Sequence, residues 1–188
     1  FLAAVMLGTW DNSPVGPDEL KVGTTRKFFS IEDYAADISQ ARLFTGQTVS
    51  SMSVSLAPNQ MVTTTFSMIG KDMTISGSQT AQVDLSAVTR GVPFDAYSGD
   101  LSIGDVGSAS ASAIVTAVDF SIDNAFQPSF VIGDDGPVCL NYGFATIEGT
   151  FTAFFADATL IERFLNETET ALTVSVNDPS GNNEYTFE

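Results

Sequence analysis

Strict alternation of apolar and polar residues is the feature that most constrains the fold of this chain. Serines alternate with apolar side chains over residues 51–56, and a second alternating run follows over 62–68. Because successive side chains of a β-strand point to opposite faces of a sheet, this period of two predicts half-buried strands. The intervening Pro58-Asn59 pair is typical of a turn, so the two runs predict a hairpin.

The same alternation recurs in the second half of the chain. Strands are expected over residues 114–122, 142–155 and 172–176, and the turn-forming run 178–182 leads into a last strand. With 44% apolar and 16% charged residues, the chain can bury one core, so a single domain over 1–188 is the expectation. The sequence therefore predicts a mainly β protein.

One segment shows clear helical spacing. Residues of about 157–166 carry apolar side chains at i, i+1, i+4 and i+5, which predicts one flanking α-helix capped by Asp157. We expect its apolar stripe to pack in the subunit core. The stripe consists of Leu160, Ile161, Phe164 and Leu165. Weaker spacing also allows one or two helical turns within residues 30–44.

Two segments interrupt the strand pattern. Residues 1–27 hold an apolar start followed by several prolines and glycines, which predicts an N-terminal arm beside the core. Residues 91–113 are rich in Gly, Ser, Ala and Asp, which predicts a long exposed loop with room for a short strand over 101–103.

The residue inventory excludes most catalytic and metal sites. The chain has no His and one cysteine, so neither a His-dependent nucleophile nor a multi-thiolate metal site can form. Cys139 is expected to be a small core residue. Asp134-Asp135-Gly136 is expected to be a turn, with a calcium site as the alternative. We therefore expect no enzyme activity, no cofactor and no metal.

Charge is strongly one-sided. Seven bases against 23 acids give a net charge of −16, and Arg163 is the only base after Arg90. Because nucleic acids are held by cationic side chains that displace counterions, tight DNA binding is not expected. The simpler explanation of the charge is solubility. No apolar window is long enough for a membrane-spanning helix, which favours a soluble protein.

Two blocks of sequence resemble the tail tube proteins of long, non-contractile bacteriophage tails. The first block runs from Phe44-Thr45-Gly46 through the serine-alternating strand and Pro58-Asn59 to the segment 66–73. The second comprises segments 118–124, 148–153, 164–168 and 178–181. The resemblance covers about residues 44–188 and consists of structural motifs in a fixed order.

The resemblance implies a β-sandwich or barrel-like subunit with one flanking helix and long inter-subunit loops. It also implies a structural virion protein that forms stacked, hexameric rings, assembles in the host cytoplasm, and surrounds a tape measure protein and later the passing DNA. Alternatives are the tube of a contractile tail or a type VI-like secretion system, a β-sandwich adhesin, and an enzyme that uses carboxylates.

A tube implies a lumen, and alternation suggests which residues line it. Asp119 and Ser121 lie on the polar face of the strand over 114–122, so they are lumen-lining candidates. Glu148 and Asp84 are weaker candidates. The alternative is that these residues lie on the outer surface.

Overall fold

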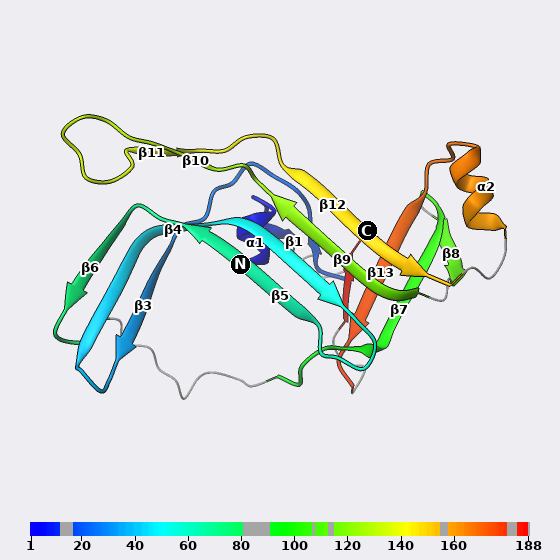
Figure 1. Ribbon diagram of the computed structural model, residues 1–188, viewed down its shortest axis with the longest axis horizontal. Helices are drawn as coiled ribbons and strands as arrows, with labels where there is room; N and C mark the ends of the chain where they lie inside the picture. Colours follow the sequence, from blue (N-terminus) through cyan, green and yellow to red (C-terminus); the bar gives the residue numbers. More distant parts are fainter. Residues whose placement is uncertain are drawn as a thin grey trace. The chain divides into compact units, whose positions relative to one another are not determined.

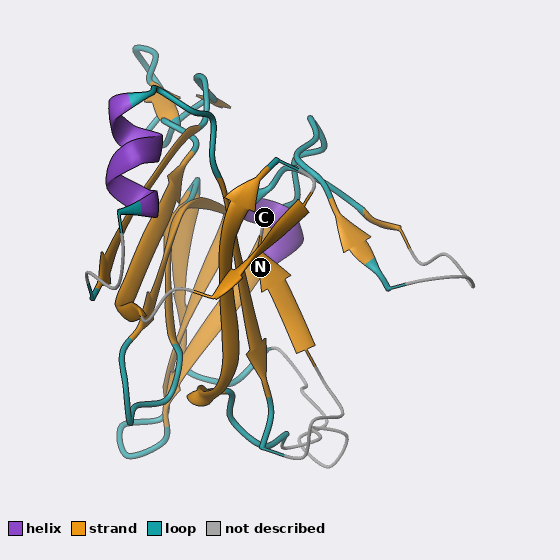
Figure 2. Cartoon of the chain, turned by 90° about the vertical axis from the view of Figure 1, so that its right-hand side faces the viewer, coloured by secondary structure: helices purple, strands orange, loops and turns teal. Residues whose placement is uncertain are grey.

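The computed structural model describes residues 1–11, 17–80, 91–106, 108–112, 115–154, 158–179 and 184–187. Strands predominate, with two short helices (Figures 1 and 2), so the predicted fold class is confirmed. The described strands form four sheets and no closed barrel. Within these residues, neither helix is long and apolar enough to cross a membrane.

The chain divides into two compact units that are interleaved in sequence. Unit 1 comprises Phe1–Ser53, Thr65–Val88 and Ser121–Ile147, and unit 2 comprises Val54–Thr64, Thr89–Phe120 and Glu148–Glu188. The expectation of a single domain stays a prediction.

Unit 1 contains the first helix, most of the longest strand and several short strands. Its elements are α1 (Leu2–Val5), β1 (Trp10–Asp11), β2 (Glu19–Leu20), β3 (Phe29–Ala35), most of β4 (Gln40–Leu56), most of β5 (Thr63–Ile69), β6 (Asp72–Ser76), β10 (Gln127–Ser129) and β11 (Cys139–Asn141). β4 pairs with β3, β5, β6 and β9, so this strand organises the largest sheet.

The start of the chain packs into the core of unit 1. Ala4 and Val5 are fully buried, and the Phe1 ring lies 5.1 Å from that of Phe29 and 5.5 Å from that of Phe66. Asn124, 2% exposed, donates from Nδ2 to the Val5 carbonyl at 2.7 Å. Residues 1–8, expected to form an arm beside the core, are therefore part of it.

Residues 30–44 form an antiparallel hairpin, so the expected helical turns are wrong. In β3 and β4, Ile31 pairs with Phe44 and Tyr34 with Ala41, and Ser39 takes a positive φ of 51° in the turn. Pairing in the sheet overrides a weak apolar spacing, because each paired residue satisfies backbone hydrogen bonds. The predicted hairpin around Pro58-Asn59 is confirmed by β4, β5 and the positive φ of Asn59.

Unit 2 is built on a four-stranded antiparallel sheet in the order β14-β13-β7-β8. Its elements are β7 (Asp95–Asp105), β8 (Ser108–Ser112), most of β9 (Val115–Asp123), most of β12 (Thr146–Ala153), α2 (Thr159–Leu165), β13 (Ala171–Asn177) and β14 (Glu184–Phe187). Buried Ile103, Val118, Val174 and Val176 contribute to its core, and the rings of Phe120 and Phe187 lie 4.9 Å apart.

The segment 91–113 holds strands β7 and β8, which corrects the expectation of a long exposed loop. β7 pairs on one side with β13, where Ile103 faces Leu172, and on the other side with β8. Small side chains weaken the sequence signal for a strand, but they do not prevent backbone pairing. Ile103, which is 4% exposed, anchors this stretch in the core of unit 2.

Candidate functional site: the polar face of β9 and β12

The polar face of two adjacent strands carries three of the proposed lumen residues. β9 and β12 are neighbours in the largest sheet. On β9, Val118 and Ile122 are buried, whereas Asp119 is exposed and Ser121 is half-buried, so polar side chains alternate with the core. The prediction that these two residues lie on the polar face of the strand is confirmed, and whether that face lines a lumen stays a prediction.

Gly149 of β12 shows which residues share this face. A Cβ atom at Gly149 would lie 3.3 Å from the Cβ of Phe120 and 3.4 Å from the Asp119 carbonyl oxygen. Position 149 therefore points to the same side as Phe120. Because side chains alternate along a strand, exposed Glu148 points to the opposite side, which is the side of Asp119. The two carboxylates thus lie on one face, on neighbouring strands.

The polar face continues along β12. Glu148, Thr150 and Thr152 alternate on it, and all three are exposed. Thr116 Oγ1 of β9 donates to the Thr152 carbonyl at 3.1 Å, which ties the two strands together at this end. The surface is therefore acidic and hydroxyl-rich. The fourth candidate, Asp84, lies outside the described residues.

Few basic side chains are available to bind a phosphate backbone. Arg42 is paired with Asp33, Arg163 Nη2 lies 3.0 Å from Asp105 Oδ1, and Lys21 Nζ lies 2.8 Å from Glu19 Oε2. The last contact lowers the pKa of Glu19 and raises that of Lys21, chiefly through their side-chain hydrogen bond.

Arg26 is also engaged within unit 1. Its Nη1 donates to the Leu140 carbonyl at 3.0 Å, and its guanidinium lies 5.2 Å from the centre of the Tyr142 ring. Four of the seven bases are thus held by intramolecular partners, which weakens any interaction with polyanions.

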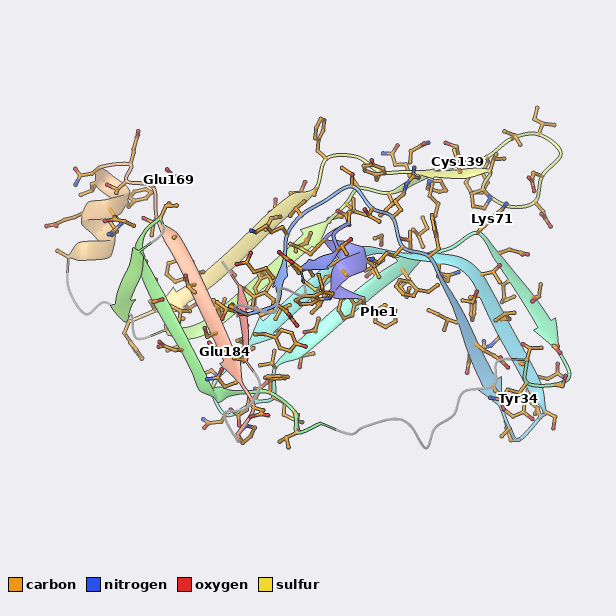
Figure 3. The ribbon with its side chains drawn as sticks, turned by 180° about the vertical axis from the view of Figure 1, so that it is seen from behind. Phe1, Tyr34, Lys71, Cys139, Glu169 and Glu184 are labelled. Carbon is orange, nitrogen blue, oxygen red and sulfur yellow. The ribbon has the colours of Figure 1, made fainter. Side chains whose placement is uncertain are left out.

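Cys139 lies on the surface, so the prediction of a core cysteine is wrong. The residue belongs to β11, is exposed (Figure 3), and its Sγ lies 3.8 Å from Asn141 Oδ1. The short strand pair β10-β11 buries Leu140 but not its neighbours, which explains the exposure. The Asp134–Gly136 turn is exposed or half-buried, and no group of three or more metal-binding side chains occurs among the described residues.

The predicted helix is present, but its apolar stripe is not part of the core. Ile161, Phe164 and Leu165 of α2 are 48%, 83% and 70% exposed. The side chain of Leu160, like the expected cap Asp157, lies outside the described residues. The helix begins after Ala158 with no side-chain cap.

Large exposed apolar residues are the feature that the sequence analysis missed. Ile132 and Phe144 of unit 1 are essentially fully exposed, as is most of Phe164. The uninterrupted run Phe130-Val131-Ile132 beside two aspartates was an available signal, since an apolar run next to an acidic turn is poorly placed to enter a core. Where exposed apolar side chains gather in one patch, they mark a surface that other molecules cover.

Comparison with known proteins agrees with these features. The family model described as phage tail tube protein matches residues 1–187. The match includes residues 1–43 and 91–113, in which no individual motif resembled the tail tube proteins. A search of curated proteins gives no significant match. Since the family match spans almost the whole sequence, the chain belongs to the phage tail tube protein family.

Proposed function

We propose that the chain is the tube subunit of a long, non-contractile phage tail, in which stacked hexameric rings form the channel for DNA ejection. Membership of the family makes the chain a structural component of the virion tail. Ring number, tail type and the passage of DNA are the proposed parts. A tape measure protein within the lumen is the proposed partner during assembly in the host cytoplasm, and no catalysis is proposed.

The observation that carries the proposal is the exposed apolar surface of a mainly β chain. Ile132, Phe144 and Phe164 are 107%, 97% and 83% exposed. Burial of apolar surface stabilises a protein or a complex by about 25 cal/mol per Å². The single chain does not gain this free energy for the exposed side chains. Association of many copies would recover this free energy, and a polymer offers each copy several contacts.

The acidic polar face of β9 and β12 supports the passage of DNA. A single carboxylate at 10 Å from a phosphate contributes only about 0.4 kcal/mol in water before screening. A tube repeats Asp119 and Glu148 in every copy of every ring, against a duplex that carries one charge per roughly 1.7 Å. A wall that repels DNA along its whole length would let the genome slide without being held.

Electron microscopy of the purified chain tests the proposal. We expect hollow cylinders of uniform diameter, and end-on views with sixfold symmetry. A chain that stays monomeric or trimeric and binds a glycan would instead be an adhesin. Cylinders with a different symmetry would retain the tube and overturn the hexamer.

Tail type requires a separate observation. A gene for a sheath protein beside the gene for this chain would favour a contractile tail. Its absence, together with binding of a tape measure protein in co-expression, is the expected result.

A further inference from the structure

In helix α2, Arg163 faces its own unit, whereas the apolar side chains Ile161, Phe164 and Leu165 are exposed. Arg163 is 23% exposed at its side chain and pairs with Asp105, the last residue of β7, so it faces its own unit. At about 100° per residue, Ile161 and Leu165 lie about 160° from Arg163 around the helix axis, and Phe164 lies about 100° from it. The apolar stripe of α2, defined as these three residues, is therefore directed away from unit 2, consistent with their exposure.

The surroundings of the stripe are acidic. Glu162 lies within the helix, and Glu167 and Glu169 follow its end; all three are exposed, and Glu169 is labelled beside α2 in Figure 3. An apolar patch with an acidic rim is best covered by an apolar surface that carries bases. The chain itself has such bases, because five of its seven basic residues belong to unit 1.

Unit 1 presents an apolar surface with bases beside it. In the sheet formed by β3, β4 and β6, Ile31 pairs with Phe44 and Phe44 with Met73, and the next row is Asp33, Arg42 and Ile75. Paired residues point to the same side of a sheet. We call this surface the Ile31 face; it consists of Ile31, Asp33, Arg42, Phe44, Met73 and Ile75.

The Ile31 face is accessible. Met73 is 45% and Ile75 65% exposed, whereas Ile31 and Phe44 are half-buried. Arg42 is exposed beside Ile75 and Asp33 in the same row, and it is ion-paired with Asp33. Lys71, which is exposed and directly precedes β6 (Figure 3), has no ion pair within the described part of the chain.

We infer that the apolar stripe of α2 in one copy docks on the Ile31 face of a second copy. The two surfaces match in apolar character, and the acidic rim of α2 meets Lys71, because Arg42 is already paired with Asp33 on the same face. An assembly that grows without limit requires head-to-tail contacts, in which two different surfaces of one chain bind each other. The inference rests on the proposed polymerisation, and it names the pair of surfaces that one of those contacts uses.

Cross-linking between differently tagged chains tests the pairing. In a Cys139→Ser background, chains with Leu165→Cys are mixed with chains with Met73→Cys, allowed to assemble, and treated with a short bis-maleimide. We expect cross-linked dimers that contain one chain of each kind, and none when either chain assembles alone. Val22→Cys, at an exposed site of unit 1, replaces Met73→Cys as the matched control and is expected to give no product.

Two substitutions that introduce a negative charge test the contribution of each surface to assembly. Phe164→Glu and Ile75→Glu should each leave a folded chain, shown by circular dichroism, and raise the critical concentration for assembly by at least about tenfold. Val92→Glu and Val22→Glu, both at exposed apolar sites, are the controls and should assemble normally.

The outcomes separate this inference from the proposed function. Tubes without the cross-link between residues 165 and 73, or cross-links between two Leu165→Cys chains, would overturn the inference alone. Normal assembly of Phe164→Glu would do the same. A wild-type chain that never associates would overturn the proposed function and this contact with it.

Discussion

The Arg163 guanidinium lies 3.0 Å from the Asp105 carboxylate, and this ion pair fastens α2 to the end of β7. Through this contact, the Arg163 side of the helix faces unit 2. One nitrogen of Arg163, Nη1, is buried without a hydrogen-bond partner in the described structure. The contact thus combines a favourable ion pair with an unsatisfied donor. Substitution of Asp105 and substitution of Arg163 should therefore change the free energy of unfolding by different amounts.

Asp105→Ala should destabilise unit 2 by about 1–3 kcal/mol, because it leaves the largely buried guanidinium without its charged acceptor. Arg163→Met should change the free energy of unfolding by less than about 1 kcal/mol, since it removes the pair and the unsatisfied nitrogen together. Urea denaturation of both variants measures the difference. Equal losses of stability in the two variants would show that Arg163 Nη1 has a hydrogen-bond acceptor in solution.

Phe164→Ala should change the free energy of unfolding by less than about 0.5 kcal/mol, because the side chain is largely exposed in the single chain. The matched core variant is Ile103→Ala, 4% exposed in β7, which should cost about 2–5 kcal/mol. Thermal unfolding of the unassembled protein compares them. A loss of stability in Phe164→Ala as large as that in Ile103→Ala would show that the apolar stripe of α2 packs in the core.

Asn124→Ala should destabilise unit 1 by about 1–3 kcal/mol. The substitution removes the hydrogen bond from Asn124 Nδ2 to the buried Val5 carbonyl and leaves that acceptor unsatisfied. Asn141→Ala is the control, since its side chain is exposed and contacts only exposed or half-buried side chains, Ser129 Oγ at 2.8 Å and Cys139 Sγ at 3.8 Å, among the contacts described. Hydrogen exchange at residues 2–7 should accelerate in the first variant only.

Deletion of residues 96–110 should unfold unit 2. The deletion removes most of β7, the strand that joins β13 to β8 in the four-stranded sheet. A stretch that formed an exposed loop could instead be removed with the fold intact. Limited proteolysis and circular dichroism distinguish the two results, and shortening the exposed turn at 133–135 is the tolerated control.

Replacement of Asp119 and Glu148 by Lys should leave tubes able to assemble but make them retain DNA at low salt. The two carboxylates lie on the same face of neighbouring strands, so the change reverses the charge of one continuous surface. Asp18→Lys with Asp37→Lys, both at exposed positions, gives the same net change elsewhere. Retention equal to that of this control would place Asp119 and Glu148 on the outer surface.

Local periodicity predicted most of the strands, because alternation is a property that a strand shows without its partners. The hairpin of β4 and β5, the polar alternation of Asp119 and Ser121, and the position of α2 are all visible in the sequence. Net charge and the lack of His are likewise fixed by composition alone. Family-specific motifs then indicated a tail tube protein, in agreement with the family match.

Tertiary structure decided what the pattern left open, namely which partner each element meets. Residues 95–105 form a strand because β13 lies beside β7, although the two strands are far apart in sequence. The apolar stripe of α2 predicted burial, yet Ile161, Phe164 and Leu165 are exposed and Arg163 contacts Asp105 of β7. A helical stripe specifies that an apolar side exists, whereas the long-range contact that anchors the helix determines whether this chain or another one covers it.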